Sequence, residues 1–321
     1  MAFPPQGTAG NDVFYRTSPF NTLHDGYDYL DGSDGYDAIS LWGGGTVLDY
    51  AWGGVSNFEL LLLGTGTWSF TLGGAAAAAF TGGHVVIDAW AATSINIDGS
   101  GLGAGATLQV LGSFGADTII GGSGTNAFQG RGGGDLLMGG GSWDFFYLAD
   151  RGDLAGDTIN GGGGIDTLVM QGGQRINDVD FLHISHVETL QLQGTGAQIV
   201  TLGATASAAF DGAVTLSATN SHGMYLDASN FSPALHVIAT AYADSFVFGG
   251  AGDAVIYNFT THGQAEADQV QLLGHSLAEV QAMLASAVDA SNGTYLYHDG
   301  HVLVFSGVAK AALSTADFLF A

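Results

Sequence analysis

The sequence predicts an all-β protein, a parallel β-roll or β-solenoid with a small α+β region at its C-terminal end. Two repeats carry this prediction: a nine-residue unit that recurs along the chain, and a longer segment that occurs twice at an offset of about 129 residues. Composition is the third observation, because 53 of the 321 residues are Gly while 46% are hydrophobic. That much apolar surface argues against disorder, so we expect the chain to fold.

The nine-residue unit has the form G-G-x-G-x-D-x-U-x, in which U is a large apolar residue. Its sixth position is Asp in all units but one, which has Asn126. A four-residue insertion, 148–151, interrupts the longest run. The units lie at 7–15, 23–31, 32–40, 112–120, 121–129, 130–138, 139–147, 152–160, 161–169 and 239–247, followed by a degenerate unit at 249–257.

In each unit the Gly-rich half is predicted to turn and the x-U-x half to form a short strand, so that two units close one coil. The apolar eighth residue then points inward. Units n and n+2 stack, which pairs Asp117 with Asp135 and Asp144 with Asp166.

Stacked carboxylates and turn carbonyls offer only oxygen ligands, which suit several Ca2+ ions. Folding is then expected to depend on calcium. The alternative, that these aspartates are plain turn residues, stays open. The predicted ligands are Asp12, Asp28, Asp37, Asp117, Asp135, Asp144, Asp157, Asp166 and Asp244, with Gly26, Gly35, Gly115, Gly133 and Gly164 in the turns.

The longer repeat aligns 32–40 with 161–169 and 55–66 with 184–196. It predicts a first module at 1–138, a second at 139–257 and a distinct C-terminal domain at 258–321. Between the nine-residue units, apolar stretches recur about every 12 residues without helical spacing, which favours a continuing solenoid over a β-sandwich. Predicted strands lie at 60–63, 68–72, 85–87, 94–97 and 108–111, with counterparts near Leu190, Ile199, Val214, Tyr225 and Leu235.

The last 65 residues differ in pattern. Strand 268–273, helix 277–288 and hairpin 293–305 are predicted, with Asp299-Gly300 as the two-residue turn. The sequence Gly274-His-Ser-Leu-Ala278 imitates a nucleophile elbow, but Ser276 and Glu279 instead fit a helix capping box.

The nine-residue units resemble those of the RTX family, calcium-binding proteins exported by bacterial type I systems. The strand-rich segments resemble alphaproteobacterial surface-layer RTX proteins, and the C-terminal elements, which end in Asp317, Phe318 and Phe320, resemble a type I secretion domain. The resemblance implies export without cleavage and folding in calcium outside the cell. Asn126, Ser142, Ala155, Tyr242 and Leu23 depart from the family pattern, which questions calcium binding at Asn126 and Asp244.

No enzymatic site is predicted. The pairs His183/His186 and His298/His301 lack a third zinc ligand nearby in the sequence, and the chain has no Cys. The five Trp residues suit aromatic packing or, alternatively, a carbohydrate-stacking face.

Charge indicates which partners to expect. The chain has 30 Asp+Glu, of which 26 are Asp, against 5 Lys+Arg, for a net charge of −25. Nucleic acid and anionic membranes are therefore disfavoured. Residues 1–7 have neither a basic nor an apolar region, and no apolar run is long enough to span a membrane, so we expect no Sec-type signal peptide and no membrane span.

Together these features predict a secreted, non-enzymatic structural protein that assembles at the cell surface or in the extracellular matrix, as a lattice or filament. One hypothesis stacks Asp244 of one copy near Asp12 of the next, while residues from Asn258 onward could instead cap that end. Expected partners are a second copy, the type I secretion machinery and a cell-surface polysaccharide. An adhesin or ligand-binding module is the alternative, and an RTX-type hydrolase is a weaker one.

Overall fold

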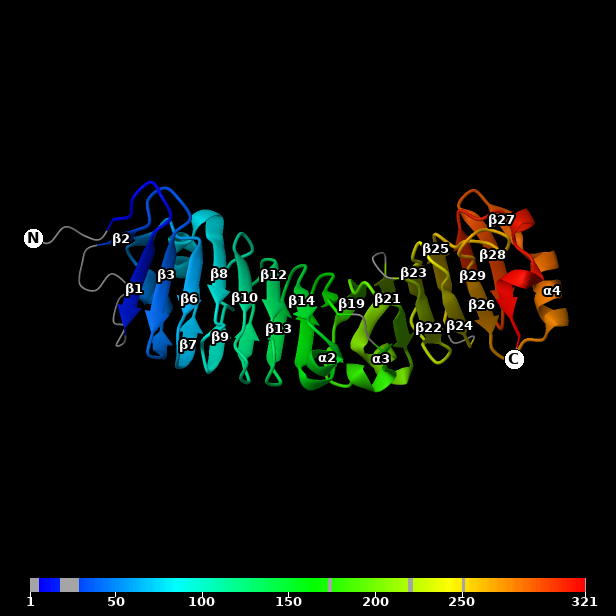
Figure 1. The fold of residues 1–321 in the computed structure, drawn as a ribbon, viewed down its shortest axis with the longest axis horizontal. Helices are drawn as coiled ribbons and strands as arrows, with labels where there is room; N and C mark the ends of the chain where they lie inside the picture. The colour runs from blue at the N-terminus through cyan, green and yellow to red at the C-terminus, as the bar shows by residue number, and fades with distance from the viewer. Residues whose placement is uncertain (1–5, 18–28, 173–174, 219–221, 250–251, 321) are drawn as a thin grey trace, which may run out of the picture. The chain divides into compact units, whose positions relative to one another are not determined.

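A computed structural model describes residues 6–17, 29–172, 175–218, 222–249 and 252–320 (Figure 1). The chain forms two compact units: the first comprises Met1–Tyr147 and Gly156–Asp166, and the second comprises Leu148–Ala155 and Thr167–Ala321. The three domains expected from the sequence repeats stay a prediction.

The first unit consists mainly of parallel strands, and the chain passes alternately between two sheets (Figure 1). The strands of one sheet lie in the order β1 (Val13–Thr17), β3 (Ala38–Trp42), β6 (Leu60–Leu63), β8 (His84–Asp88), β10 (Thr107–Leu111), β12 (Asn126–Gln129) and β14 (Phe145–Leu148). Those of the other are β4 (Gly45–Val47), β7 (Thr67–Thr71), β9 (Ser94–Asp98), β11 (Thr118–Ile120), β13 (Leu136–Gly140) and β15 (Thr158–Gly162). A short pair, β2 (Leu30–Asp31) and β5 (Val55–Ser56), completes the unit.

Strand register confirms that two nine-residue units make one coil. Leu108 pairs with Asn126, and Thr118 pairs with Leu136, a step of two units in each case. Where the four-residue insertion occurs, the step lengthens and Leu136 pairs with Thr158. The inserted residues begin the short helix α2 (Arg151–Gly156).

The core lies between the two sheets, and the side chains at the eighth position of the units fill much of it. Ile119, Phe128, Leu137 and Phe146 are all fully buried, and the Phe128 and Phe146 rings meet edge to face at 6.0 Å. In β11 to β14, burial alternates along the strand and leaves the neighbouring side chains less buried, as a strand of period two requires. The predicted inward position is therefore confirmed.

The second unit repeats this design. One sheet has β16 (Thr167–Met170), β19 (Val187–Leu192), β21 (Phe210–Ser217), β23 (Leu235–Ile238) and β25 (Ala254–Tyr257), and it continues into β29 (His301–Ser306), β28 (Gly293–His298) and β27 (Val288–Ala290). The other has β17 (Arg175–Ile176), β20 (Gln198–Thr201), β22 (Met224–Ala228), β24 (Ser245–Phe248), β26 (Gln269–Leu272) and β30 (Phe318–Leu319). The short strand β18 (Ile184–Ser185) also belongs to this unit.

The duplication extends to two helices that the periodicity did not predict, α1 (Gly74–Ala79) and α3 (Ala204–Ala209). Both are rich in Ala, the strongest helix former. A 3-10 turn of the preceding coil, η1 (Asp49–Trp52) or η3 (Asp178–Phe181), caps each helix, because its first residue accepts hydrogen bonds from N–H groups at the N-terminus of the helix. Reading these segments as strand and loop alone was wrong.

The C-terminal elements lie as predicted, with α4 (Leu277–Ser286) before an antiparallel hairpin of β28 and β29. They also close the sheets, since β24 pairs with β26 and β26 with β30. The hypothesis that Asp244 of one copy stacks near Asp12 of another is therefore wrong, because the backbone beside Asp244 is already paired within the chain. None of the helices in the described part of the chain has the length and hydrophobicity needed to cross a bilayer.

Candidate metal centre

The aspartates of the nine-residue units line up in rows, one along each sheet. We define row 1 as Asp117, Asp135 and Asp157, and row 2 as Asn126, Asp144 and Asp166. In row 1 the backbone N–H of Asp117 donates to Oδ1 of Asp135, and that of Asp135 donates to Oδ1 of Asp157, each at 2.9 Å. In row 2 the N–H of Asp144 donates to Oδ1 of Asp166 at 2.8 Å. The predicted stacking of units n and n+2 is thus confirmed, while calcium ligation stays a prediction.

Each row is buried, although all its members except Asn126 carry carboxylates. The row aspartates are at most 2% exposed. Because one carboxylate oxygen accepts a hydrogen bond from the neighbouring coil, the other is left to face the turn of its own unit. Oδ2 of Asp144 has no hydrogen-bond partner among the described residues.

Carbonyl oxygens converge on the same places. A Cβ atom added to Gly139 would lie 2.4 Å from Oδ2 of Asp144 and 2.3 Å from the carbonyl oxygen of Gly161. A Cβ on Gly112 would lie 2.6 Å from both Oδ2 of Asp117 and the carbonyl oxygen of Gly130. In these two units the first residue must therefore be Gly, and the carboxylate and carbonyl oxygens around it are acceptors, as a hard cation prefers.

The fourth residue of the unit stacks on the backbone of the preceding coil. A Cβ on Gly133 would lie 2.4 Å from the carbonyl carbon of Gly115, and one on Gly164 would lie 2.1 Å from the carbonyl oxygen of Ser142. Gly35, Gly133 and Gly164 also adopt positive φ angles of 134°, 124° and 128°. These positions demand Gly for the shape of the turn, and Gly115 is equally crowded, lying against the carbonyl oxygen of Thr93.

Two turns without Asp show how the carbonyl oxygens are satisfied by a donor. Nδ2 of Asn126 donates to the carbonyl oxygens of Gly124 (2.8 Å) and Gly139 (3.1 Å) and to Oδ1 of Asp144 (2.7 Å). In the second unit, Nε2 of Gln198 donates to the carbonyl oxygen of Gly196 at 2.9 Å. In both turns an amide NH2 thus donates to carbonyl oxygens, and in the case of Asn126 also to a carboxylate.

Hydroxyl groups provide a second substitute at the start of rows. Oγ of Ser113 donates to Oδ1 of Asp117 at 2.8 Å, and Oγ1 of Thr240 donates to Oδ1 of Asp244 at 2.9 Å. Thr8 makes the corresponding 2.9 Å bond to Asp12. These carboxylates accept a hydrogen bond from a nearby hydroxyl group, whereas Oδ2 of Asp144 accepts none from the described residues.

Burial also shifts the pKa values of these carboxyl groups. It raises the pKa of Asp144 to about 6, against hydrogen bonds from Asn126 that act in the opposite direction. Burial likewise raises the pKa of Asp37, Asp117 and Asp244 above the usual range. A carboxylate that is costly to ionise when the site is metal-free becomes favourable when a cation neutralises it.

The N-terminal units form a similar row, which ends in Glu59 instead of Asp. The N–H of Asp12 donates to Oδ1 of Asp37 at 2.8 Å, and the N–H of Asp37 donates to Oε2 of Glu59 at 2.6 Å. Oδ2 of Asp37 has no hydrogen-bond partner among the described residues. The predicted ligands Asp28 and Gly26 lie outside the described residues.

Sequence reasoning missed Asp268. Its Oδ1 accepts from the N–H of Asp244, and its Oδ2 accepts from that of Thr260, both at 2.8 Å. Burial raises its pKa to about 7. The signal was present as Asp268-Gln-Val, the D-x-U end of a unit, but the lengthened turn before it hid the nine-residue spacing. Glu59 was missed because its side chain is longer than that of Asp.

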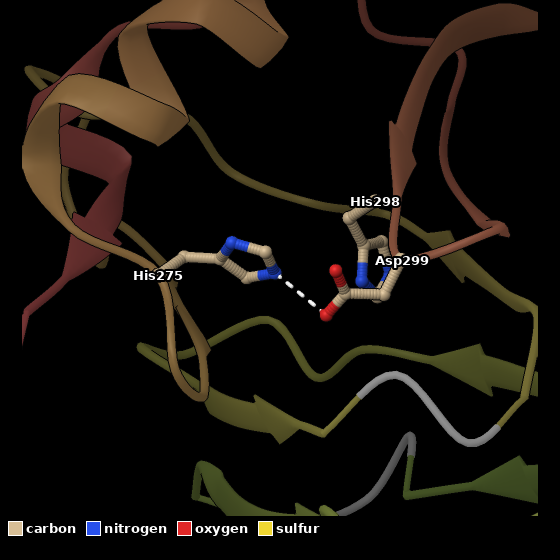
Figure 2. A group of neighbouring side chains, drawn as sticks. All are labelled: His275, His298 and Asp299. Atoms are coloured by element: carbon tan, nitrogen blue, oxygen red, sulfur yellow. Dashed lines mark hydrogen bonds and ion pairs between the residues drawn. The ribbon is translucent and has the colours of Figure 1, made fainter.

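The nucleophile-elbow imitation is a helix cap. Oγ of Ser276 accepts from the N–H of Glu279 at 3.4 Å, and the N–H of Ser276 donates to Oε2 of Glu279 at 2.7 Å, as the capping box predicts. His298, for which the sequence offered no third ligand, lies beside His275 and Asp299, two residues that come from different elements (Figure 2).

The five Trp residues divide into two groups. Trp52 and Trp68 belong to the core, whereas Trp42, Trp90 and Trp143 are 41%, 62% and 61% exposed. Trp52 and Trp68 thus pack in the core, whereas a role in carbohydrate stacking stays a prediction for the three exposed tryptophans. Comparison of the chain with protein-family models, with curated proteins and with solved structures finds no match.

Proposed function

We propose that this chain is a secreted, calcium-stabilised structural protein of RTX type that assembles outside the cell. Its aspartate rows hold several Ca2+ ions between stacked coils. The observation that carries the proposal is the buried carboxylate oxygen of Asp144, which has no donor among the described residues and lies, like the carbonyl oxygen of Gly161, close to Gly139. Leaving such a group unmatched costs about 1 to 3 kcal/mol, and a bound cation removes that cost.

The row itself supplies the test, since Asn126 shows how an amide satisfies the same environment. We expect Asp144→Asn to stabilise the protein in EDTA by about 1 to 3 kcal/mol, because a neutral donor replaces a buried carboxylate. In calcium the order reverses. The wild type gains about 2.7 kcal/mol at a calcium concentration 100 times Kd, and the variant lacks that site.

Thermal and urea unfolding of both proteins, in EDTA and in millimolar Ca2+, measure this crossover. Asp211→Asn is the matched control, because Asp211 is exposed and belongs to neither row. Equal stability of wild type and Asp144→Asn in both conditions would mean that Asp144 is a plain turn residue.

Assembly is supported by an exposed aromatic column on the turns that join the two sheets of the first unit. Trp90 and Phe114 (71% exposed) occupy corresponding turns of coils that are neighbours through the pairing of β8 with β10. Arg131, in the next turn, lies 5.8 Å from the Phe114 ring centre. Exposed apolar patches of this kind mark contact surfaces. We test this surface by electron microscopy and light scattering of the wild type and a Trp90→Ser/Phe114→Ser variant, with and without calcium. If the variant forms polymers as ordered as those of the wild type, this surface is not the contact.

A second candidate, an extracellular ligand-binding module, is favoured by the same exposed tryptophans, since aromatic rings stack on sugars. The two functions separate cleanly in solution. A calcium-folded monomer that binds polysaccharide through Trp90 supports the binding module, whereas calcium-dependent ordered polymers support the structural protein.

Export through a type I system rests on the resemblance of the C-terminal region. Fusion of residues 258–321 to a carrier protein, in cells with and without a type I exporter, tests it. Retention of the carrier inside exporter-containing cells would contradict this route.

A further inference from the structure

Three potential metal ligands gather at the C-terminal end of the second unit: His275, His298 and Asp299. Their ligand atoms all lie within 4.8 Å of one another, and Nε2 of His275 lies 3.0 Å from Oδ2 of Asp299 (Figure 2). The two imidazole rings are perpendicular, with centres 6.1 Å apart. None of these residues belongs to an aspartate row.

Two separate elements bring the ligands together. His275 lies in the turn between β26 and α4, where its N–H donates to the carbonyl oxygen of Leu272 at 3.3 Å. The Ser276 capping box begins α4 at the next residue and so restricts the backbone at His275. The position of this histidine is therefore determined by its local structure.

His298 and Asp299 come from the hairpin. His298 ends β28, and Asp299 and Gly300 form the turn with positive φ angles of 47° and 83°. Positive φ at both central residues is the mark of a type I′ turn, which matches the twist of the two strands. Since the hairpin pairs over its whole length, the turn presents Asp299 to His275 on a rigid support.

The ion pair between His275 and Asp299 does not involve His298. It is 5% exposed, and its ring nitrogens make no hydrogen bond or ion pair with any described residue. The ring nitrogens are not fully enclosed, so an ion can still reach them. Burial, together with the nearby His275, lowers the pKa of His298.

The donor set selects the kind of metal. Two imidazole nitrogens and one carboxylate oxygen suit Zn2+ and similar first-row ions, whereas Ca2+ prefers oxygen ligands alone. Ligands of tetrahedral zinc lie about 3.3 to 3.5 Å apart, given bonds of about 2.0 to 2.1 Å, so small side-chain rotations suffice to close the site. The Asp299 side chain is 56% exposed, which leaves an approach for the ion and a position for a water ligand.

Further charges around the cluster also favour a cation. Asp253 lies 3.5 Å from Nδ1 of His301, which pairs with His298 across the hairpin. Glu279 is close enough to His275 for their charges to interact.

We propose that His275, His298 and Asp299 bind one Zn2+ or chemically similar transition-metal ion, which fastens the turn before α4 to the β28–β29 hairpin. This site is separate from the calcium sites in its ligands and in its metal. It would remain if the aspartate rows bound no calcium.

The experiment is a ZnCl2 titration of the full chain by calorimetry, and by competition with a coloured zinc chelator, in a buffer with excess Ca2+. The excess Ca2+ keeps the oxygen-only sites from taking up zinc. We expect one zinc ion per chain and a rise in Tm. His275→Asn and Asp299→Asn should each lower zinc affinity at least about tenfold. This is the smallest loss seen when a residue that only supports a metal ligand is replaced, and these variants each remove a direct ligand.

The variants are chosen to keep the fold. Asp299→Asn retains an Asn-Gly turn, which favours the same type I′ geometry. His275→Asn removes a mostly buried imidazole, whose side chain is 9% exposed, and His84→Asn, in the first unit, is the control that removes an exposed imidazole elsewhere. Circular dichroism in calcium checks that all are folded.

Two outcomes overturn the proposal: a wild type that binds no zinc under these conditions, and folded His275→Asn and Asp299→Asn proteins that bind it as tightly as His84→Asn does. Because calcium-dependent unfolding is measured separately, failure here leaves the proposed calcium function standing, and the reverse also holds.

Discussion

At the scale of single residues, the difference between a carboxylate and an amide decides what a turn needs. Asn126 supplies its own donor to the surrounding carbonyl oxygens, and Asp144 in the next coil of the same row does not. Their backbone environments are alike, because both follow from the same nine-residue unit. The replacement of NH2 by O− therefore separates a turn whose carbonyl oxygens have a donor from a turn that suits a cation.

Ionisation of Asp144 makes the metal-free protein sensitive to pH. Its folded-state pKa of about 6 lies above the ordinary value of about 3.9. A raised carboxyl pKa contributes stability that is fully present below pH ~4 and is lost as pH rises through about 6. In EDTA we thus expect the stability difference between Asp144→Asn and the wild type to grow from pH 4 to pH 7, measured by urea unfolding. A difference that does not change with pH would show that Asp144 ionises normally.

The glycines at the fourth position can be tested in the same way. Gly133 combines a φ of 124° with a close approach to Gly115, so Gly133→Ala should destabilise the protein by more than about 1 kcal/mol. Gly141 offers the control, because a Cβ there meets nothing within 4 Å. Similar melting temperatures for the two alanine variants would contradict this account of the turn.

At the scale of elements, the two helices depend on a remote acid for their N-termini. Oδ1 of Asp49 accepts from the N–H groups of Gly73 (2.7 Å) and Ala76 (2.9 Å). Oδ1 of Asp178 binds Gly203 and Ala206 at 2.7 and 2.8 Å. The helices α1 and α3 have only six residues each, too few to be stable alone, so the cap from the previous coil determines where they form.

Removal of the cap should be costly and dependent on pH. We expect Asp178→Ala to lower stability by about 1 kcal/mol at pH 7. Burial alone would raise the pKa of Asp178, but hydrogen bonds from Ala206, Thr205 and Gly203 outweigh it, and the pKa lies below the usual value. The contribution is therefore present above pH ~4 and is lost as pH falls through the lower folded pKa. Chemical unfolding of wild type and variant at pH 7 and pH 3 measures this, and a penalty that is as large at pH 3 would refute it.

At the scale of the whole molecule, the need for metal differs between the two units. Rows 1 and 2 lie in the first unit. In the second unit, the carboxylate oxygens of Asp244 and Asp268 already accept hydrogen bonds from Thr240 and Thr260. Calcium should therefore stabilise the first unit more than the second.

Hydrogen exchange measured by mass spectrometry gives this comparison directly. On addition of Ca2+ to the metal-free protein, we expect the gain in protection to be largest in peptides that cover β11 to β15 and small in peptides that cover β20 and β22. Uniform protection of both units would place the calcium effect outside the two rows.

The sequence alone determined the coil. A unit of nine residues, with Gly where the backbone must approach another coil and an apolar eighth residue, allows one stacking, and the register of two units per coil follows from it. These features are local and periodic, so they can be recognised without knowledge of the rest of the chain. The C-terminal strand, helix and hairpin were equally evident, because caps and two-residue turns have strong local signals.

Tertiary structure alone decided which groups meet when they are far apart in sequence. It placed Asp268 beyond a lengthened turn in line with Asp244, brought Asp49 to the start of a short helix, and set His275 beside Asp299. It also decided that the C-terminal strands cover the sheet edge beside Asp244. The physical reason is that hydrogen bonds and burial depend on distance in space, and loops of variable length separate that distance from any fixed spacing along the chain.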